Sequence, residues 1–205
     1  MDQPQGQVTA RYKRVLLKLS GESLCAPGGF GIDGHELEEI AKEIVQARDT
    51  GVQLAIVVGG GNMIRGAKLA KEGHIVQSTA DYMGMLGTVV NGLALKEILE
   101  KMGKPTRVLS ALNLSSVAES FIRARAIRHL EKGRIVVFVA GTGNPFFTTD
   151  TAAALRATEI GAQLVMKATK VDGIYDKDPM KHADAVKFDH ITFKEAVDRQ
   201  LQVMD

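Results

Sequence analysis

Cysteine and tryptophan are almost missing from this chain, which has one cysteine, Cys25, and no tryptophan in 205 residues. A lone cysteine cannot form an internal disulfide, which indicates a reducing compartment, and we expect a cytoplasmic protein. An excess of charge of one sign is missing as well, because 26 Lys and Arg balance 24 Asp and Glu. We therefore expect no nucleic-acid partner, since such a partner requires a basic surface.

Long apolar runs are also absent. The N-terminus, MDQPQGQVTARYKR, has no signal-peptide pattern, and the apolar stretch 82–102 is interrupted by Asn91, Lys96, Glu97 and Glu100. This stretch predicts a helix in an interior or an interface and no contact with a membrane. The five histidines lack ligand spacing, so we expect no metal bound directly by the protein. The composition favours one globular domain over residues 1–205, with 1–11 as a flexible tail.

Short apolar runs alternate with helical patterns along the chain. Capping-box patterns mark two helix starts, at Asp33 with Glu36 and at Thr192 with Glu195. Strands that are apolar on both faces and separated by helices predict an α/β fold, with a parallel sheet covered on both sides. The predicted strands are 15–20, 53–58, 107–111, 135–140 and 163–169, and the predicted helices begin at 33 and 192 or span 82–102, 124–132 and 150–160.

Polar segments that contain glycine follow four of the predicted strands. In open α/β sheets, ligands bind beyond the carboxyl ends of the strands, so these segments predict a binding site on one rim. They are KLSGES at 18–23, GGGNMIRG at 59–66, GTGNPFFTTD at 141–150 and KATKVDGIYDKDP at 167–179.

The triple glycine 59–61 is the first candidate for phosphate binding. Three residues without a Cβ let backbone N–H groups approach phosphate oxygens, although a flexible turn is the alternative. A Rossmann fingerprint would need glycine at position 64, which is Ile64, and the chain has no Walker A sequence. The predicted phosphate site is thus of neither common type.

Charged residues at the same strand ends are the second candidate. Lys18 interrupts an apolar strand, and it serves either as an edge lysine that reaches water or as a cation for phosphates. Lys167 repeats this pattern, and Arg65 follows the glycines with a guanidinium suited to phosphate. Asp150 stands where a helix should begin, so an N-cap role competes with a role in holding the lysines.

The chain contains, in this order, the segments VLLKLSGESL, VVGGGNMIRG, ADYMGMLGTVVNGLAL, AGTGNPFFTTDTAAALR and KATKVDGIYDKDP. Together these five segments resemble the bacterial uridylate (UMP) kinases of the amino acid kinase superfamily. The resemblance runs from about Tyr12 to the end of the chain. It implies a three-layer αβα sandwich with a mainly parallel sheet and transfer of the γ-phosphoryl group of ATP to UMP in pyrimidine nucleotide biosynthesis. It also implies Mg²⁺ held through phosphates, a homohexamer, GTP as activator and UTP as inhibitor, and further strands beyond Asp205.

The same resemblance implies roles for individual residues. Lys18, Asp150, Lys167 and Arg65 form the catalytic set. The residues expected to bind ATP are Lys18, Leu19, Ser20, Gly21, Gly61, Arg65, Thr169, Tyr175 and Asp178. UMP is assigned to Gly60, Asp81, Thr142, Gly143, Asn144, Pro145, Phe146, Phe147, Thr148 and Thr149. The loop that responds to GTP is assigned to Ala26, Pro27, Gly28, Gly29, Phe30 and Gly31.

Some of these positions have a second interpretation from the sequence alone. Asp81 stands where the helix over 82–102 should begin, which suits an N-cap as well as a ribose contact. Phe146 and Phe147 are aromatic side chains that belong to cores more often than to ligand sites. The rival functions are a superfamily kinase that acts on a carboxylate or carbamate, and a non-catalytic relative that stores nucleotides or oxyanions.

Overall fold

The computed structural model describes residues 11–64, 73, 75–169 and 171–201. The predicted tail 1–11 lies outside this part of the chain except for its last residue. The chain forms two compact units, Met1–Lys167 and Ala168–Asp205. The single domain expected over residues 1–205 stays a prediction.

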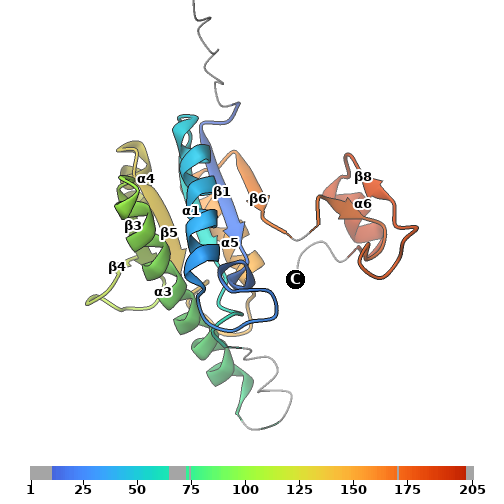
Figure 1. The fold of residues 1–205 in the computed structure, drawn as a ribbon, viewed down its shortest axis with the longest axis horizontal. Coiled ribbons are helices and arrows are strands. Elements are labelled where there is room, and N and C mark those ends of the chain that lie inside the picture. Colours follow the sequence, from blue (N-terminus) through green and yellow to red (C-terminus); the bar gives the residue numbers. More distant parts are fainter. Residues whose placement is uncertain (1–10, 65–72, 74, 170, 202–205) are drawn as a thin grey trace, which may run out of the picture. The chain divides into compact units, whose positions relative to one another are not determined.

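The first unit is built on a six-stranded sheet in which every pair of neighbouring strands is parallel. The strand order is β4-β3-β5-β2-β1-β6, so β1 lies between β2 and β6 (Figure 1). The strands are β1 (Arg14–Leu19), β2 (Gln53–Val58), β3 (Thr106–Ser110), β4 (Glu119–Ser120), β5 (Ile135–Val139) and β6 (Leu164–Lys167).

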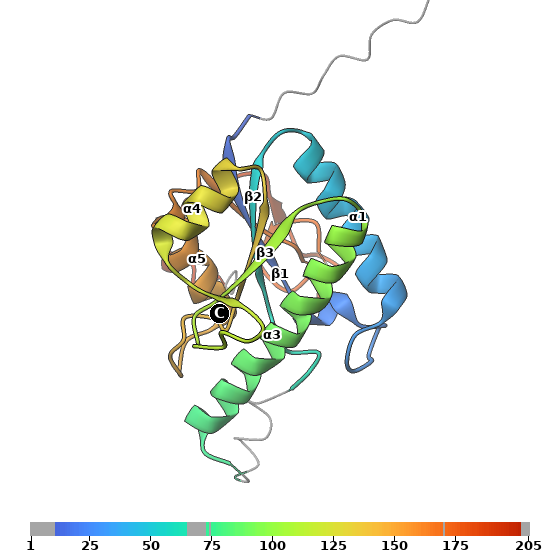
Figure 2. The same ribbon diagram turned by 90° about the vertical axis from the view of Figure 1, so that its left-hand side faces the viewer.

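Helices cover both faces of this sheet, which confirms the α/β class and the three layers. α1 (Gly34–Asp49) packs against α3 (Gln77–Lys101) on one side, and α4 (Arg123–Glu131) packs against α5 (Thr149–Ile160) on the other (Figure 2). A short 3-10 helix, η1 (Gly21–Leu24), follows β1. The core between the sheet and the pair α4 and α5 contains Leu16, Ala55, Val57, Leu109, Ala126, Leu130, Val136, Phe138, Ala153, Ala157 and Ile160.

The predicted helix starts are confirmed to within one residue for four helices and are wrong for α3. Asp33 caps α1 through bonds from His35 N and Glu36 N, and Thr192 forms the predicted capping box with Glu195. α3 begins at Gln77 without a side-chain cap, five residues before the predicted start and four before Asp81. α4 and α5 each begin one residue before the predicted start.

The second unit contains a two-stranded antiparallel sheet and a short helix. The strands are β7 (Ile174–Tyr175) and β8 (Lys187–Phe188), and the helix is α6 (Phe193–Asp198). Neither strand was expected, because a two-residue strand has no periodicity that a sequence could reveal. No described helix is both long and apolar enough to span a bilayer.

Candidate functional site

Two lysines lie next to each other at the carboxyl edge of the sheet. Lys18 on β1 pairs in register with Lys167, the last residue of β6. Because neighbouring residues in a parallel pair project to the same face, the two side chains share one side of the sheet. The interpretation of Lys18 as an edge-strand lysine is wrong, since β1 has a strand on either side.

Asp150 joins the two lysines. Lys18 Nζ lies 2.8 Å from Asp150 Oδ1, and Lys167 Nζ lies 2.6 Å from Oδ2. The carboxylate is only 1% exposed, against 12% for Lys18 and 29% for Lys167. Asp150 stands in the first turn of α5, where the helix dipole favours a negative charge. Thr148 is the N-cap of α5, so the N-cap interpretation of Asp150 is wrong.

This cluster keeps Asp150 ionised. Burial raises the pKa of the carboxyl, but hydrogen bonds from Lys167 and Lys18 and the charges of both lysines outweigh burial and hold the pKa below its ordinary value. These three described side chains, two cations and one anion, sum to one positive charge. Such a site favours an anionic ligand, because the lysines remain attractive to phosphate after Asp150 is counted.

The glycine loop, residues 59–61, lies between the end of β2 and α3. A Cβ on Gly60 would come within 2.5 Å of Gly84 O, and one on Gly59 within 2.9 Å of Gly21 N. Both glycines are therefore required by packing. Gly61 is exposed and a Cβ there would meet nothing within 4 Å. Of the three, Gly61 alone has open space where a Cβ would lie.

Residues near the end of β1 have mixed environments. Leu19 is buried, so only its backbone could meet a ligand. Ser20 accepts a bond from Glu22 N and caps η1. Gly21 has no room for a side chain, since a Cβ would lie 2.5 Å from Asn62 Oδ1. Arg65 lies outside the described residues.

The segment over 142–149, assigned to uridine, and the residue Ala140 before it are held by α3. Thr88 Oγ1 accepts from Ala140 N at 2.7 Å, and Ala140 has a φ of 61°. Asp81 Oδ2 accepts from Phe146 N at 2.8 Å, and Phe146 has a φ of 70°. Left-handed backbone at residues other than glycine costs about 1–3 kcal/mol each, so the surrounding bonds must hold it. Asp81 is not the N-cap of α3; it stabilises this loop.

The aromatic side chains of this loop do not belong to the core. Phe146 is 70% and Phe147 58% exposed, which makes the core interpretation wrong. Thr142 and Asn144 bond to each other within the loop, and Gly143 has a φ of 83°. The remaining assigned residues, Pro145, Thr148 and Thr149, lie between this turn and the start of α5.

The residues assigned to adenosine belong to the second unit and are exposed or half-buried there. Thr169 donates to Val171 O at 2.5 Å, and Tyr175 donates to Asp172 Oδ1 at 2.5 Å. Asp178 accepts from Met180 N and pairs with Lys181, and both contacts lower its pKa.

Two buried asparagines that the sequence analysis had not assigned to the site lie beside the glycine loop. Asn62 is 2% and Asn91 0% exposed, and their amides bond to each other. The sequence feature that could have indicated Asn91 is its position as a polar residue within an apolar helix. The segment assigned to GTP, residues 26–31, is exposed up to Phe30 and contacts Asn62 through Gly31.

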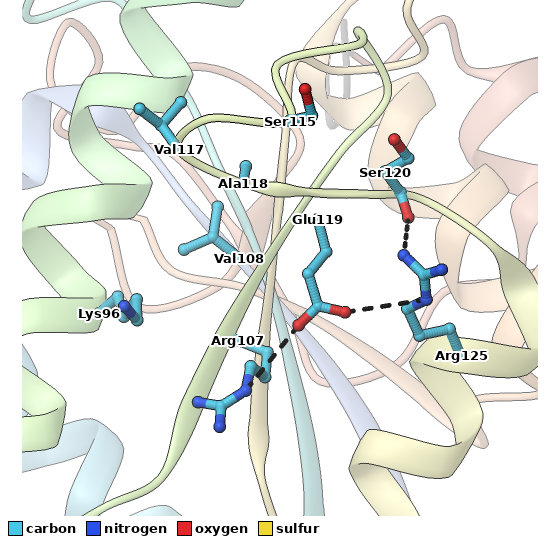
Figure 3. Close-up of a pocket in the computed structure, with 9 residues that line it drawn as sticks. All are labelled: Lys96, Arg107, Val108, Ser115, Val117, Ala118, Glu119, Ser120 and Arg125. Carbon is cyan, nitrogen blue, oxygen red and sulfur yellow. Dashed lines mark hydrogen bonds and ion pairs between the residues drawn. The ribbon is translucent and has the colours of Figure 1, made fainter.

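A separate cavity of about 450 Å³ lies near β3, β4 and α4. Glu119 points between Arg107 and Arg125 in this cavity and pairs with both, at 3.8 Å each (Figure 3). Its lining includes none of the residues assigned to ATP or UMP. Within the described residues, no group of three or more His, Cys, Asp or Glu could hold a metal ion.

Comparison with known proteins gives one consistent result. The amino acid kinase family model matches residues 13–204. The chain is 58% identical to a uridylate kinase of Xanthomonas campestris pv. campestris and 57% to one of Xanthomonas oryzae pv. oryzae. Each match covers 95% of this chain and 80% of the relative.

Solved structures agree with this match. A UMP kinase from Bacillus anthracis superposes with a TM-score of 0.91 at 40% identity, over 95% of this chain and 80% of the other. A UMP kinase from Ureaplasma parvum gives 0.88 at 36% identity, over 96% and 83%. With its parallel sheet and its lysine–aspartate centre, the chain belongs to the amino acid kinase family.

Proposed function

We propose that this chain is a UMP kinase, which transfers the γ-phosphoryl group of ATP to UMP and yields ADP and UDP. The observation that carries the proposal is the convergence of Lys18 and Lys167 on Asp150 at the sheet edge next to the glycine loop. The similarity to uridylate kinases at 57–58% identity supports UMP as the acceptor.

The reaction requires charge compensation and alignment more than acid–base catalysis. An oxygen of the UMP phosphate forms a bond to the γ-phosphorus as the bond to the bridging β–γ oxygen breaks, and the electron pair leaves with ADP. The UMP oxygen is already ionised near neutral pH, so no side chain must remove a proton from it. Lys18 and Lys167 would stabilise the negative charge on the transferred group, and Asp150 would hold both ammonium groups in place.

The assignment of ligands follows the resemblance to uridylate kinases. In the first unit, ATP would contact Lys18, Leu19, Ser20, Gly21, Gly61 and Arg65. In the second unit, the residues assigned to its adenosine are Thr169, Tyr175 and Asp178. UMP would contact Gly60 through its phosphate, Asp81 through its ribose and residues 142–149 through its base. The exposure of Phe146 and Phe147 supports this assignment, because exposed aromatic faces can stack on a base.

Magnesium fits this site as part of the ATP complex. The carboxylate of Asp150 is already engaged by two lysines, so the phosphate oxygens would be the ligands and no protein side chain would bind the ion directly. Bound in this way, Mg²⁺ supplies positive charge to the phosphates.

Assembly and regulation belong to the same proposal. Tyr82, Leu86 and Val90 form an exposed stripe on α3, at 42%, 46% and 44% exposure, which suits the interface of a homohexamer. GTP would activate through residues 26–31 and UTP would inhibit. The enzyme would act in the cytoplasm, in pyrimidine nucleotide biosynthesis.

A coupled assay of ADP release tests the function directly. UMP, CMP, dUMP and carbamate are offered in parallel with ATP and Mg²⁺. We expect rapid turnover with UMP and poor turnover with CMP. Equal rates with UMP and CMP would overturn the acceptor assignment, turnover with carbamate would favour a superfamily kinase of another type, and no turnover would favour a storage protein.

A further inference from the structure

The two buried asparagines behind the glycine loop form a closed pair. Asn62 Nδ2 donates to Asn91 Oδ1 at 3.0 Å, and Asn91 Nδ2 donates to Asn62 Oδ1 at 2.7 Å. Both residues are at most 2% exposed. Burying two amides is costly unless their hydrogen bonds are made, so the position of each side chain is strictly determined.

Each amide has a second N–H, which donates a hydrogen bond to a backbone carbonyl outside the pair. Asn91 Nδ2 donates to Gly59 O at 2.8 Å, within the glycine loop. Asn62 Nδ2 donates to Gly31 O at 2.7 Å, and Gly31 N donates back to Asn62 O at 2.8 Å. The pair thus connects α3, the glycine loop and the end of segment 26–31.

The bond from Asn91 fixes the direction of a peptide plane. The peptide between Gly59 and Gly60 is trans, so its C=O and its N–H point in opposite directions. Because Asn91 holds the carbonyl of Gly59, the N–H of Gly60 must point away from Asn91. The carbonyl of Gly60 is held in turn by Met63 N at 3.0 Å, which orients the N–H of Gly61 in the same manner.

Apolar side chains could fill the space of this pair, but they could not hold a carbonyl. Without the bond from Asn91, the plane of residues 59–60 could rotate and present a carbonyl to a phosphate. Glycine permits this rotation more readily than other residues do. A hydrogen-bond donor next to this loop therefore fixes the orientation of the peptide plane between Gly59 and Gly60, which packing alone would not fix.

We propose that Asn91 is a positioning residue for phosphoryl transfer, which acts through the Gly59 carbonyl on the N–H of Gly60, with Asn62 completing the pair and joining it to segment 26–31. The inference rests on the proposed function for its chemistry, since Gly60 is assigned to the phosphate of UMP. It concerns residues that contact no assigned ligand.

The test compares Asn91→Asp with the parent chain and with Asn113→Asp, the same change at an exposed position. Aspartate keeps the size of asparagine but loses the donor to Gly59 O. We expect kcat per folded enzyme to fall by up to about 100-fold, because misplaced reacting groups lower the rate by this amount. We also expect a higher KM for UMP. Asn113→Asp should behave as the parent. If Asn91→Asp does not fold, Asn91→Ser, which is uncharged and still donates one hydrogen bond, replaces it, with a smaller loss expected.

Amide hydrogen exchange at Gly60 and Gly61 provides a readout apart from activity. Exchange should be faster in the Asn91 variant than in the parent and unchanged in Asn113→Asp. A folded Asn91 variant with parental kcat, KM and exchange rates would overturn the inference. An inactive parent would overturn the proposed function instead, and the exchange rates alone would then decide whether Asn91 orients the loop.

Discussion

At the scale of single residues, Asp150 determines the state of the charged centre. Its carboxylate is buried in the first turn of α5 and bonds to both lysines. A carboxylate in this position serves two purposes, because it offsets part of the lysine charge and fixes where the remaining charge lies. The centre should therefore respond to any change in the ionisation of Asp150.

Acid should weaken the contribution of Asp150 to stability. The folded pKa of its carboxyl is lowered, so this contribution is complete above the unfolded pKa of about 3.9 and is lost as the pH falls through the folded value. Asp150→Asn should be less stable than the parent at neutral pH. We expect a loss below the roughly 3–5 kcal/mol of a fully buried broken pair, because Lys167 is 29% exposed.

Urea unfolding of parent and variant from neutral pH down to about pH 2 measures this effect, because the folded pKa lies below the ordinary value of 3.8. The two midpoints should approach each other as the pH falls. Asp49→Asn, which breaks an exposed pair with Lys104, serves as the control and should change stability by less than about 1 kcal/mol. A constant difference between parent and Asp150→Asn over the whole range would contradict the assigned ionisation.

At the scale of elements, α3 organises the loops of the candidate site. Asn91 holds the glycine loop, Thr88 holds Ala140 and Asp81 holds Phe146. Gly60 lies so close to this helix that a Cβ would clash with Gly84 O. One helix thus sets the backbone of both loops assigned to UMP.

The neighbouring glycines Gly60 and Gly61 should respond differently to the same substitution. Gly60→Ala places a methyl group within 2.5 Å of Gly84 O and should cost about 1–3 kcal/mol, which lowers Tm by several degrees. Gly61→Ala meets no protein atom within 4 Å and should leave Tm unchanged.

Gly61→Ala, which should not change Tm, should instead change the kinetics with ATP. The methyl group of Gly61→Ala would occupy space assigned to ATP, and we expect the KM for ATP to rise about tenfold, or ~1.4 kcal/mol. Thermal melts and steady-state kinetics measure both effects. A parental KM for ATP in Gly61→Ala would remove this glycine from the ATP site.

The sequence predicted the five longer strands well, but it did not predict the two-residue strands β4, β7 and β8 or the loop contacts. Apolar runs located β1 and β2 within one residue, and the lysines were found because they interrupt such runs. The start of α3 was missed because Val76 offers no capping side chain. The roles of Thr88 and Asn91 depend on how a helix meets loops far away in the chain, which no local pattern encodes.

At the scale of the whole molecule, an exposed apolar stripe on α3 indicates assembly into an oligomer. Tyr82, Leu86 and Val90 recur every four residues along α3 and are each more than 40% exposed, whereas Val89 and Leu95 on the same helix are buried. The helix therefore has one apolar face for its own sheet and a second for another surface.

Leu86→Glu should reduce the size of the assembly. We expect the parent chain to elute as an oligomer several times its monomer mass of 22.1 kDa, and the variant as a smaller species with a similar circular dichroism spectrum. Leu155→Glu changes an exposed leucine of α5 and should leave the mass unchanged. Light scattering at micromolar concentration measures all three, and a monomeric parent would refute the interface.

In the proposed reaction, Lys18, Lys167 and Asp150 form the centre at which the phosphoryl group is transferred. The most direct test is the kcat of Lys18→Ala with UMP and ATP, compared with Lys42→Ala, which removes a half-exposed lysine of α1. We expect kcat to fall by a factor on the order of 10²–10³ in Lys18→Ala, as for removal of one donor that stabilises a transition state, and to stay at the parental value in Lys42→Ala. A folded Lys18→Ala protein with unchanged kcat would contradict this role of Lys18.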